Sequence, residues 1–136
     1  MTLKHHRRFP GILAFTLNNP IRRWVEPPER LIQKLSIAPG DVVVDFGCGT
    51  GFFTVPMAKI ASRTFAVDVS SHMLKSTESY GEKHCVKVEV VQSDGKQIKI
   101  EDDSVDIVFL SHVFHEVEDR PRVLGEFRRI IKQGGG

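Results

Sequence analysis

The feature that most constrains the fold of this chain is a glycine-rich turn that directly follows an apolar run. Val42, Val43 and Val44 precede the sequence DFGCGTG at residues 45–51, which has glycine at three alternating positions. A run that is apolar at consecutive positions is typical of a strand covered on both faces of a parallel sheet. Glycine permits positive φ angles and close approach of a ligand, and the N-terminus of a following helix favours an anionic group. The turn therefore predicts either a ligand-binding loop or a tight strand-to-helix connection that binds nothing.

Apolar runs alternate with helical patterns along the rest of the chain. Apolar runs predict strands at residues 41–46, 64–69, 86–91 and 105–110, and helical patterns lie at residues 29–35, 52–61 and 71–81 and from residue 119 onward. Ser70 is placed to cap the helix at 71–81, Gly81 to end it, and Pro121 to begin the last helix. The buried stripe expected on that last helix consists of Val123, Leu124, Phe127, Ile130 and Ile131. This alternation predicts an α/β fold with right-handed crossovers.

Length and composition limit what such a fold can contain. A chain of 136 residues, 40% of them hydrophobic, has room for one domain with a single core. No apolar run approaches the roughly 20 residues of a membrane-spanning helix, so we expect no stable membrane insertion. Cys48 and Cys85 are too few for a disulfide framework and are expected to be free thiols. Pro10 and Gly11 interrupt the first apolar stretch, which argues against a targeting signal, and we expect a cytoplasmic protein.

Basic residues concentrate near the N-terminus. Residues 1–30 contain six Lys and Arg side chains against Glu26 and Glu29, whereas the whole chain has a formal net charge of +2. We therefore divide the chain into a basic extension at residues 1–28 and a core at residues 29–136. Pro20 after Asn19 favours the start of an amphipathic helix, so the extension is either a lid over the core or a solvated surface segment. The single tryptophan and the modest charge argue against a nucleic-acid surface.

Acidic residues follow two of the predicted strands. Asp68 ends the second strand, 21 positions after Gly47, and Asp94 and Gly95 follow the third strand. Because the carboxyl ends of parallel strands meet at one end of the sheet, we expect these groups beside the glycine-rich turn. A carboxylate placed like Asp68 accepts hydrogen bonds from both ribose hydroxyls of an adenosine, and Asp94 is placed to meet an adenine amine. Taken singly, an acidic residue in a loop is more often part of a solvated turn.

These motifs together resemble one family. Residues 42–51, Asp68, Asp94 and residues 104–108 resemble the class I S-adenosylmethionine-dependent methyltransferases, with greatest likeness to the small-molecule branch that includes the ubiquinone and menaquinone biosynthesis enzymes. The resemblance covers residues 29–136 and includes Met73 with Leu74, the segment 111–115 and the LGEFRR helix at 124–129. It implies a Rossmann-like parallel sheet, S-adenosylmethionine as cofactor and methyl transfer to a small molecule. The cofactor-binding residues that it implies are Asp45, Gly47, Cys48, Gly49, Thr50, Gly51, Asp68, Val69, Met73, Asp94, Gly95, Ser111 and His112.

Two other functions are weighed against this one. The first is a non-catalytic S-adenosylmethionine-binding fragment or partner subunit. The second is an NAD(P)-binding Rossmann domain, which is disfavoured because its Gly-x-Gly-x-x-Gly pattern would need glycine at Phe52. Within the family, the chain lacks the Pro-Pro-aromatic and Pro-Cys motifs that nucleic-acid methyltransferases carry, so a small molecule is the expected acceptor.

Histidines after the fourth strand suggest two further roles. His112 and His115 have a His-x-x-His spacing, but zinc needs three or four ligands and no cysteine cluster assists, so we expect no metal. His115 and Glu116 are candidates for a catalytic base that removes a proton from the acceptor. The alternative is a polar loop over the methionine end of the cofactor.

The fourth strand raises a question of assembly. By the resemblance, family members continue into strands five to seven, which this sequence lacks, so the expected sheet has the strand order 3-2-1-4. The apolar fourth strand would then lie at an exposed edge, which proteins normally pair or cover. Either a second copy in a homodimer or the N-terminal segment folded back is expected to pair with it. We favour self-association, because residues 1–26 contain no convincing strand to add.

Overall fold

The computed structural model describes residues 30, 32–33, 35–110 and 118–133, and the backbone of residues 2–4 and 12–13. Arg30, Ile32 and Gln33 are helical, within the helix predicted at residues 29–35. Across these described ranges, no helix combines the length and the apolar character needed to cross a membrane. The named elements are β1 (Thr2–Lys4), β2 (Ile12–Leu13), β3 (Val42–Phe46), α3 (Thr54–Ala58), β4 (Arg63–Asp68), α4 (Ser71–Lys83), β5 (Glu89–Gln92), β6 (Ile107–Leu110) and α5 (Arg120–Ile130).

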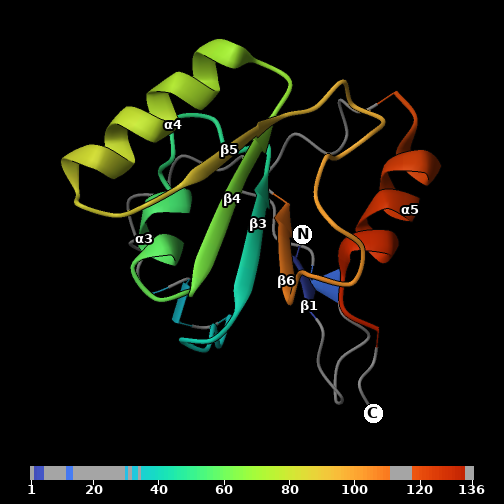
Figure 1. Ribbon diagram of the computed structural model, residues 1–136, viewed down its shortest axis with the longest axis horizontal. Helices are drawn as coiled ribbons and strands as arrows, with labels where there is room; N and C mark the ends of the chain where they lie inside the picture. The colour runs from blue at the N-terminus through green and yellow to red at the C-terminus, as the bar shows by residue number, and fades with distance from the viewer. Residues whose placement is uncertain are drawn as a thin grey trace.

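The strands form one sheet in the order β2-β1-β6-β3-β4-β5 (Figure 1). β3 pairs in parallel with β4 and with β6, and β4 pairs in parallel with β5. The predicted strand order 3-2-1-4 and the Rossmann-like α/β fold are therefore confirmed. Because the strands are parallel, the carboxyl ends of β3, β4 and β5 lie side by side at one end of the sheet.

Helices cover both faces of the parallel strands. Val44 of β3 and Val108 of β6 belong to the apolar cluster that α5 joins through Phe127. The alternate residue Val43 belongs to a second cluster, which includes Met57 of α3. Figure 1 shows α3 and α4 on one side of the sheet and α5 on the other. Consecutive residues of β3 are thus buried on opposite faces, which explains the unbroken valine run.

The N-terminal strands correct the prediction for the fourth strand. β1 pairs antiparallel with β6, in the register Thr2 to Phe109, Leu3 to Val108 and Lys4 to Ile107, and β2 pairs antiparallel with β1. The N-terminal segment therefore pairs with this edge, which was one of the two expected alternatives, and the expectation that residues 1–26 have no convincing strand to add is wrong. β1 and β2 have three and two residues, which is too short to show a hydrophobic alternation in the sequence. The unpaired backbone groups at the edge of β6 instead provide hydrogen-bond partners for β1.

Helix α4 extends beyond its predicted end at Gly81. Ser70 caps it as predicted, because its hydroxyl accepts from the backbone N–H of Met73 at 3.2 Å, but the helix continues to Lys83. A Cβ at Gly81 would lie 3.2 Å from Cγ2 of Val88, so this glycine allows close packing rather than a stop. Cys85 takes the positive φ of 59° that follows the helix instead.

Other predicted boundaries differ by a few residues. α3 is shorter than predicted, β5 begins at Glu89, and β6 begins at Ile107. Val105 forms an isolated parallel bridge with Ile131 instead of extending β6. Asp119 caps α5, where its carboxylate accepts from the backbone N–H of Arg122 at 3.2 Å. The strands and helices predicted between residues 41 and 131 exist, and their differences from the prediction lie at their ends.

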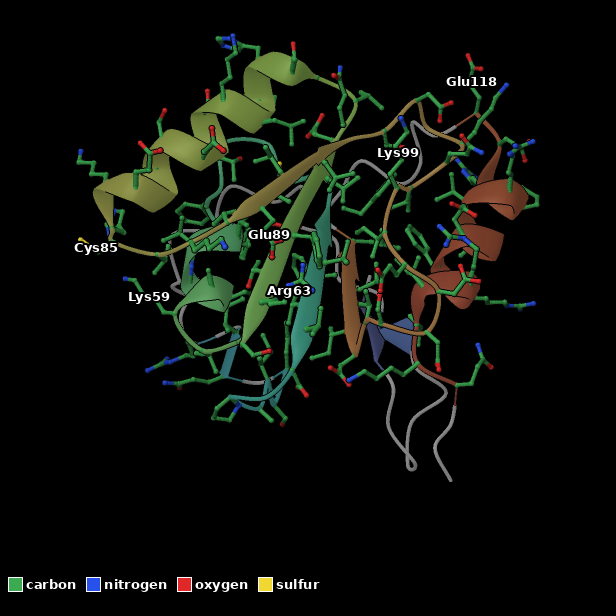
Figure 2. All side chains as sticks on the ribbon, viewed as in Figure 1. Lys59, Arg63, Cys85, Glu89, Lys99 and Glu118 are labelled. Carbon is green, nitrogen blue, oxygen red and sulfur yellow. The ribbon has the colours of Figure 1, made fainter. Side chains whose placement is uncertain are left out.

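A charged pair links β4 and β5, the two strands at the opposite end of the sheet from β2 and β1. Nη2 of Arg63 on β4 lies 2.9 Å from Oε1 of Glu89 on β5, and Figure 2 shows the two side chains meeting over the sheet. The guanidinium also lies 4.8 Å from the centroid of the Phe65 ring. The hydrogen bonds from Arg63 hold the pKa of Glu89 below its usual value. Because the Arg63 side chain is 56% exposed, solvent screening limits what this pair adds to stability.

Candidate functional site

The candidate site begins at the glycine-rich turn between β3 and α3. Gly47, Gly49 and Gly51 have φ angles of 81°, 57° and 92°, in the region that residues with a side chain rarely adopt. The N–H of Gly47 donates to the carbonyl of Val67 at 2.7 Å, which ties the turn to β4. The alternating glycines are thus required by the backbone itself, whether or not a ligand binds.

Asp68 joins the end of β4 to this turn. Its Oδ2 accepts from the backbone N–H of Gly49 at 3.2 Å, and its Oδ1 accepts from the backbone N–H of Ser70 at 3.0 Å. The backbone carbonyl of Asp68 accepts from the N–H of Ser93 at 3.0 Å, which adds the end of β5. The ends of three strands therefore meet at Asp68, whose side chain is half-buried.

The neighbours of Asp68 differ in exposure. Val69 is 59% exposed, and it is one of the two large apolar side chains of the described residues that are exposed. Met73 lies in the first turn of α4 and is partly buried. Thr50 is exposed, whereas Cys48 is buried. A single exposed valine is ordinary on a protein surface and does not by itself indicate a ligand.

Asp94 stabilises its own turn. Its Oδ1 accepts from the backbone N–H groups of Lys96 and Gln97, both at 2.8 Å, and these bonds hold the pKa of Asp94 below its usual value. The carboxylate is exposed, and Gly95 follows with a φ of 86°. One oxygen of Asp94 is thus committed to the turn, and the second is left to face solvent or a ligand.

Asp45 is a buried carboxyl group. It is 1% exposed, and its Oδ2 accepts from the hydroxyl of Thr54 at 2.5 Å. Its Oδ1 has no hydrogen-bond partner in the described part of the chain. The pKa of Asp45 is raised to about 7, because burial raises it more than the bond from Thr54 lowers it, and the charge of Asp68 raises it as well. The group is therefore poised to change charge near neutral pH.

Cys48 lies beside the same carboxylates. The pKa of its thiol is raised to about 12, mainly by burial; the bond from Thr77 opposes this, and the charges of Asp45 and Asp68 add to it. A thiol with this pKa stays protonated and is a poor nucleophile. Both Cys48 and Cys85 are free, as predicted.

Two threonines of the site were not found from the sequence. They are Thr54 and Thr77. Thr77 lies on the buried face of α4, and its hydroxyl donates to the carbonyl of Gly49 at 2.8 Å. A Cβ at Gly51 would lie 3.2 Å from Cα of Thr77, so α4 packs directly on the turn. The sequence offers one sign of Thr77: it is a polar residue at a position of α4 where the helical spacing from Leu74 would place an apolar one.

Part of the predicted site cannot be placed. Ser111, His112, His115 and Glu116 lie outside the described residues. Among the side chains that are described, no three of His, Cys, Asp or Glu gather closely enough to hold a metal ion. The described site therefore consists of the turn, the ends of β4 and β5, and the two threonines.

Helix α5, which contains the LGEFRR motif, has a structural role. Nε of Arg129 lies 2.8 Å from Oε1 of Glu126, and its Nη1 lies 2.5 Å from Oδ1 of Asp102. The same guanidinium donates to the carbonyl of Ile98 at 2.6 Å and to that of Ile100 at 2.9 Å. Glu126 also accepts from the N–H of Ile98 at 2.9 Å. This network pins the segment 98–102 to α5.

Comparison with known proteins places this geometry in context. Residues 44–136 match a family described as a methyltransferase domain. The chain is 33% identical over 110 residues to a malonyl-[acyl-carrier protein] O-methyltransferase of Yersinia pestis, covering 81% of this chain and 40% of that protein. It is 25% identical over 136 residues to a demethylmenaquinone methyltransferase of a Geobacillus species, covering 97% and 56%.

Solved structures agree with the fold. A SAM dependent methyltransferase from Aquifex aeolicus superposes with a TM-score of 0.75 at 29% identity, covering 85% of this chain and 64% of that one. The chain spans between 40% and 56% of the length of the two curated relatives above.

Proposed function

The chain belongs to the family of methyltransferase domains, and from this membership we propose that it binds S-adenosylmethionine at the carboxyl ends of β3, β4 and β5. Residues 47–51 lie against the methionine part, Asp68 accepts from the ribose hydroxyls, and Asp94 with Gly95 lies near the adenine. Ser111 and His112 are assigned to the amino-acid end. The observation that carries the proposal is the 3.2 Å bond between Gly49 and Asp68, which brings the turn and the ribose-binding acid together.

One feature of the described residues suits this cofactor. The buried Oδ1 of Asp45, without a described partner, offers an acceptor for the ammonium group of the cofactor. This feature supports a ligand at this end of the sheet.

We further propose methyl transfer to a small-molecule acceptor, the class that the names of the relatives indicate. The bound cofactor supplies a methyl group already activated on a sulfonium. The residues of the chain then orient the reactants and exclude water, and orientation alone supplies effective molarities of order 10⁵ M or more. His115 and Glu116 are the proposed bases for an acceptor that must lose a proton.

Calorimetry tests the cofactor proposal. S-adenosylmethionine and its demethylated product S-adenosylhomocysteine should both bind, and NAD should not. Asp68→Ala should abolish binding, whereas Glu82→Ala, which removes an exposed carboxylate near the far end of α4, should not. Binding of NAD alone, or equal binding by both variants, would sink the proposal.

A transfer assay separates an enzyme from a non-catalytic binding subunit. The chain is incubated with S-adenosylmethionine carrying a labelled methyl group and with a metabolite extract, and Asp68→Ala serves as the blank. Label in a small-molecule product supports the enzyme. Tight cofactor binding without transfer, across extracts, favours the binding subunit instead.

For the assembly, we propose that residues 29–136 form the cofactor-binding unit and that β1 and β2 complete its edge. A homodimer through β6 would require β1 to leave that strand. The free thiols of Cys48 and Cys85 are compatible with the reducing cytoplasm, where we place the protein.

A further inference from the structure

The buried pair of Thr54 and Asp45 has a geometry that packing alone does not explain. Thr54 is the first residue of α3 and is 0% exposed, and Asp45 on β3 is 1% exposed. The hydroxyl of Thr54 donates to Oδ2 at 2.5 Å, while Oδ1 has no partner among the described residues. A buried carboxylate oxygen without a donor costs free energy, and native structures rarely retain one without a functional reason.

The position of Thr54 determines which oxygen stays available. A carboxylate rotates about its terminal torsion with little preference, so an unheld Asp45 could turn either oxygen away from the site. The strong bond from Thr54 removes that freedom by engaging Oδ2. We propose that Thr54 is a positioning residue, which holds Asp45 so that Oδ1 accepts from the cationic amino group of the bound cofactor. This inference rests on the proposed S-adenosylmethionine site.

The surroundings of Asp45 make its charge sensitive to this one bond. The charge of Asp68 on β4 disfavours the ionisation of Asp45, and the thiol of Cys48 stays neutral. Among the described side chains that act on Asp45, Thr54 is the one that favours the carboxylate. Removal of the hydroxyl therefore raises the pKa of Asp45 above about 7 and leaves less carboxylate at neutral pH.

The test is the affinity for S-adenosylhomocysteine, measured by calorimetry from pH 6 to pH 8.5 on the full chain. The variants are Thr54→Val, which keeps the shape and loses the hydroxyl, and Thr54→Ser, which keeps the hydroxyl. Thr64→Val is the matched control, because Thr64 is also buried, at 2% exposed, and its hydroxyl has no partner in the described part of the chain.

The expected result is a loss that depends on pH. If the bond is worth about one pKa unit, Thr54→Val binds about tenfold more weakly at pH 6 and approaches the wild type by pH 8.5. Thr54→Ser and Thr64→Val should follow the wild-type profile. If Thr54→Val does not fold, Thr54→Cys replaces it, since a thiol is close in size and only a weak donor.

The outcomes separate this inference from the proposal beneath it. A wild type that does not bind S-adenosylhomocysteine refutes the proposed function itself. A wild type that binds, with a Thr54→Val loss that is absent at every pH or that Thr54→Ser shares, overturns the positioning role alone.

Discussion

Asp45→Asn should stabilise the fold at alkaline pH and not at acidic pH. Burial raises the pKa of Asp45 from 3.8 to about 7, so the folded protein binds one proton more than the unfolded chain between these two values. Stability therefore falls as the pH rises through this window, and the full cost above pH 7 is about 4 kcal/mol at about 1.4 kcal/mol per unit. Asparagine carries no charge to bury and escapes this cost.

The net effect of the substitution combines two terms. The asparagine oxygen can accept from Thr54 as Oδ2 does, but its amide then puts a buried donor where Oδ1 lies, which costs about 1–3 kcal/mol at every pH. The pH-dependent term alone changes by about 2–3 kcal/mol between pH 5 and pH 8. We therefore expect a small loss of stability at pH 5 and a gain at pH 8.

Urea unfolding followed by circular dichroism measures this difference. Comparison of Asp45→Asn with the wild type at each pH cancels the titration of the other acids, including Glu89 and Glu126, whose lowered pKa values act in the opposite direction. The same difference in free energy of unfolding at pH 5 and pH 8 would show that Asp45 is not the buried, hard-to-ionise group that the structure describes.

Three further predictions concern other parts of the molecule. Thr77→Val should weaken S-adenosylhomocysteine binding severalfold while Thr77→Ser does not, because Thr77 holds the carbonyl of Gly49; equal affinities in calorimetry would contradict this. Leu3→Pro should promote self-association in light scattering, since it disrupts β1 and opens the edge of β6; a variant that stays monomeric would show that β1 does not protect that edge. Arg129→Met should cost about 2 kcal/mol or more in urea unfolding, because it leaves two carbonyls and Oε1 of Glu126 without their donor, whereas Arg63→Met should cost less than about 1 kcal/mol; similar losses would refute the contrast.

The features of this protein that could be predicted are those that depend on residues close together in the sequence. The turn at residues 47–51 and the valine run before it mark β3, because positive φ angles require glycine and burial on both faces requires apolar side chains. Asp68 follows at the end of the next strand, and the parallel pairing of β3 with β4 brings it to the turn. These features needed only the strand order in addition to the sequence.

The unpredicted part depends on contacts between distant residues. β1 owes its conformation to the edge of β6, which lies about a hundred positions away in the chain, and its own sequence shows no strand pattern. Gly81 reads as a helix stop, yet the closeness of Val88 makes it a packing residue. The threonine that holds Asp45 is one ordinary hydroxyl in the sequence, and only the packing of α3 on β3 shows what it touches.

Amide chemical shifts of the glycines test the central claim, a cofactor site at the carboxyl ends of β3, β4 and β5. On titration with S-adenosylhomocysteine, the amides of Gly49, Gly51 and Gly95 should move and saturate together. Gly40, in the turn before β3, and Gly125, on the exposed side of α5, should stay in place as internal controls. Shifts at Gly40 or Gly125 without shifts at Gly49, or the same response to NAD, would contradict the account.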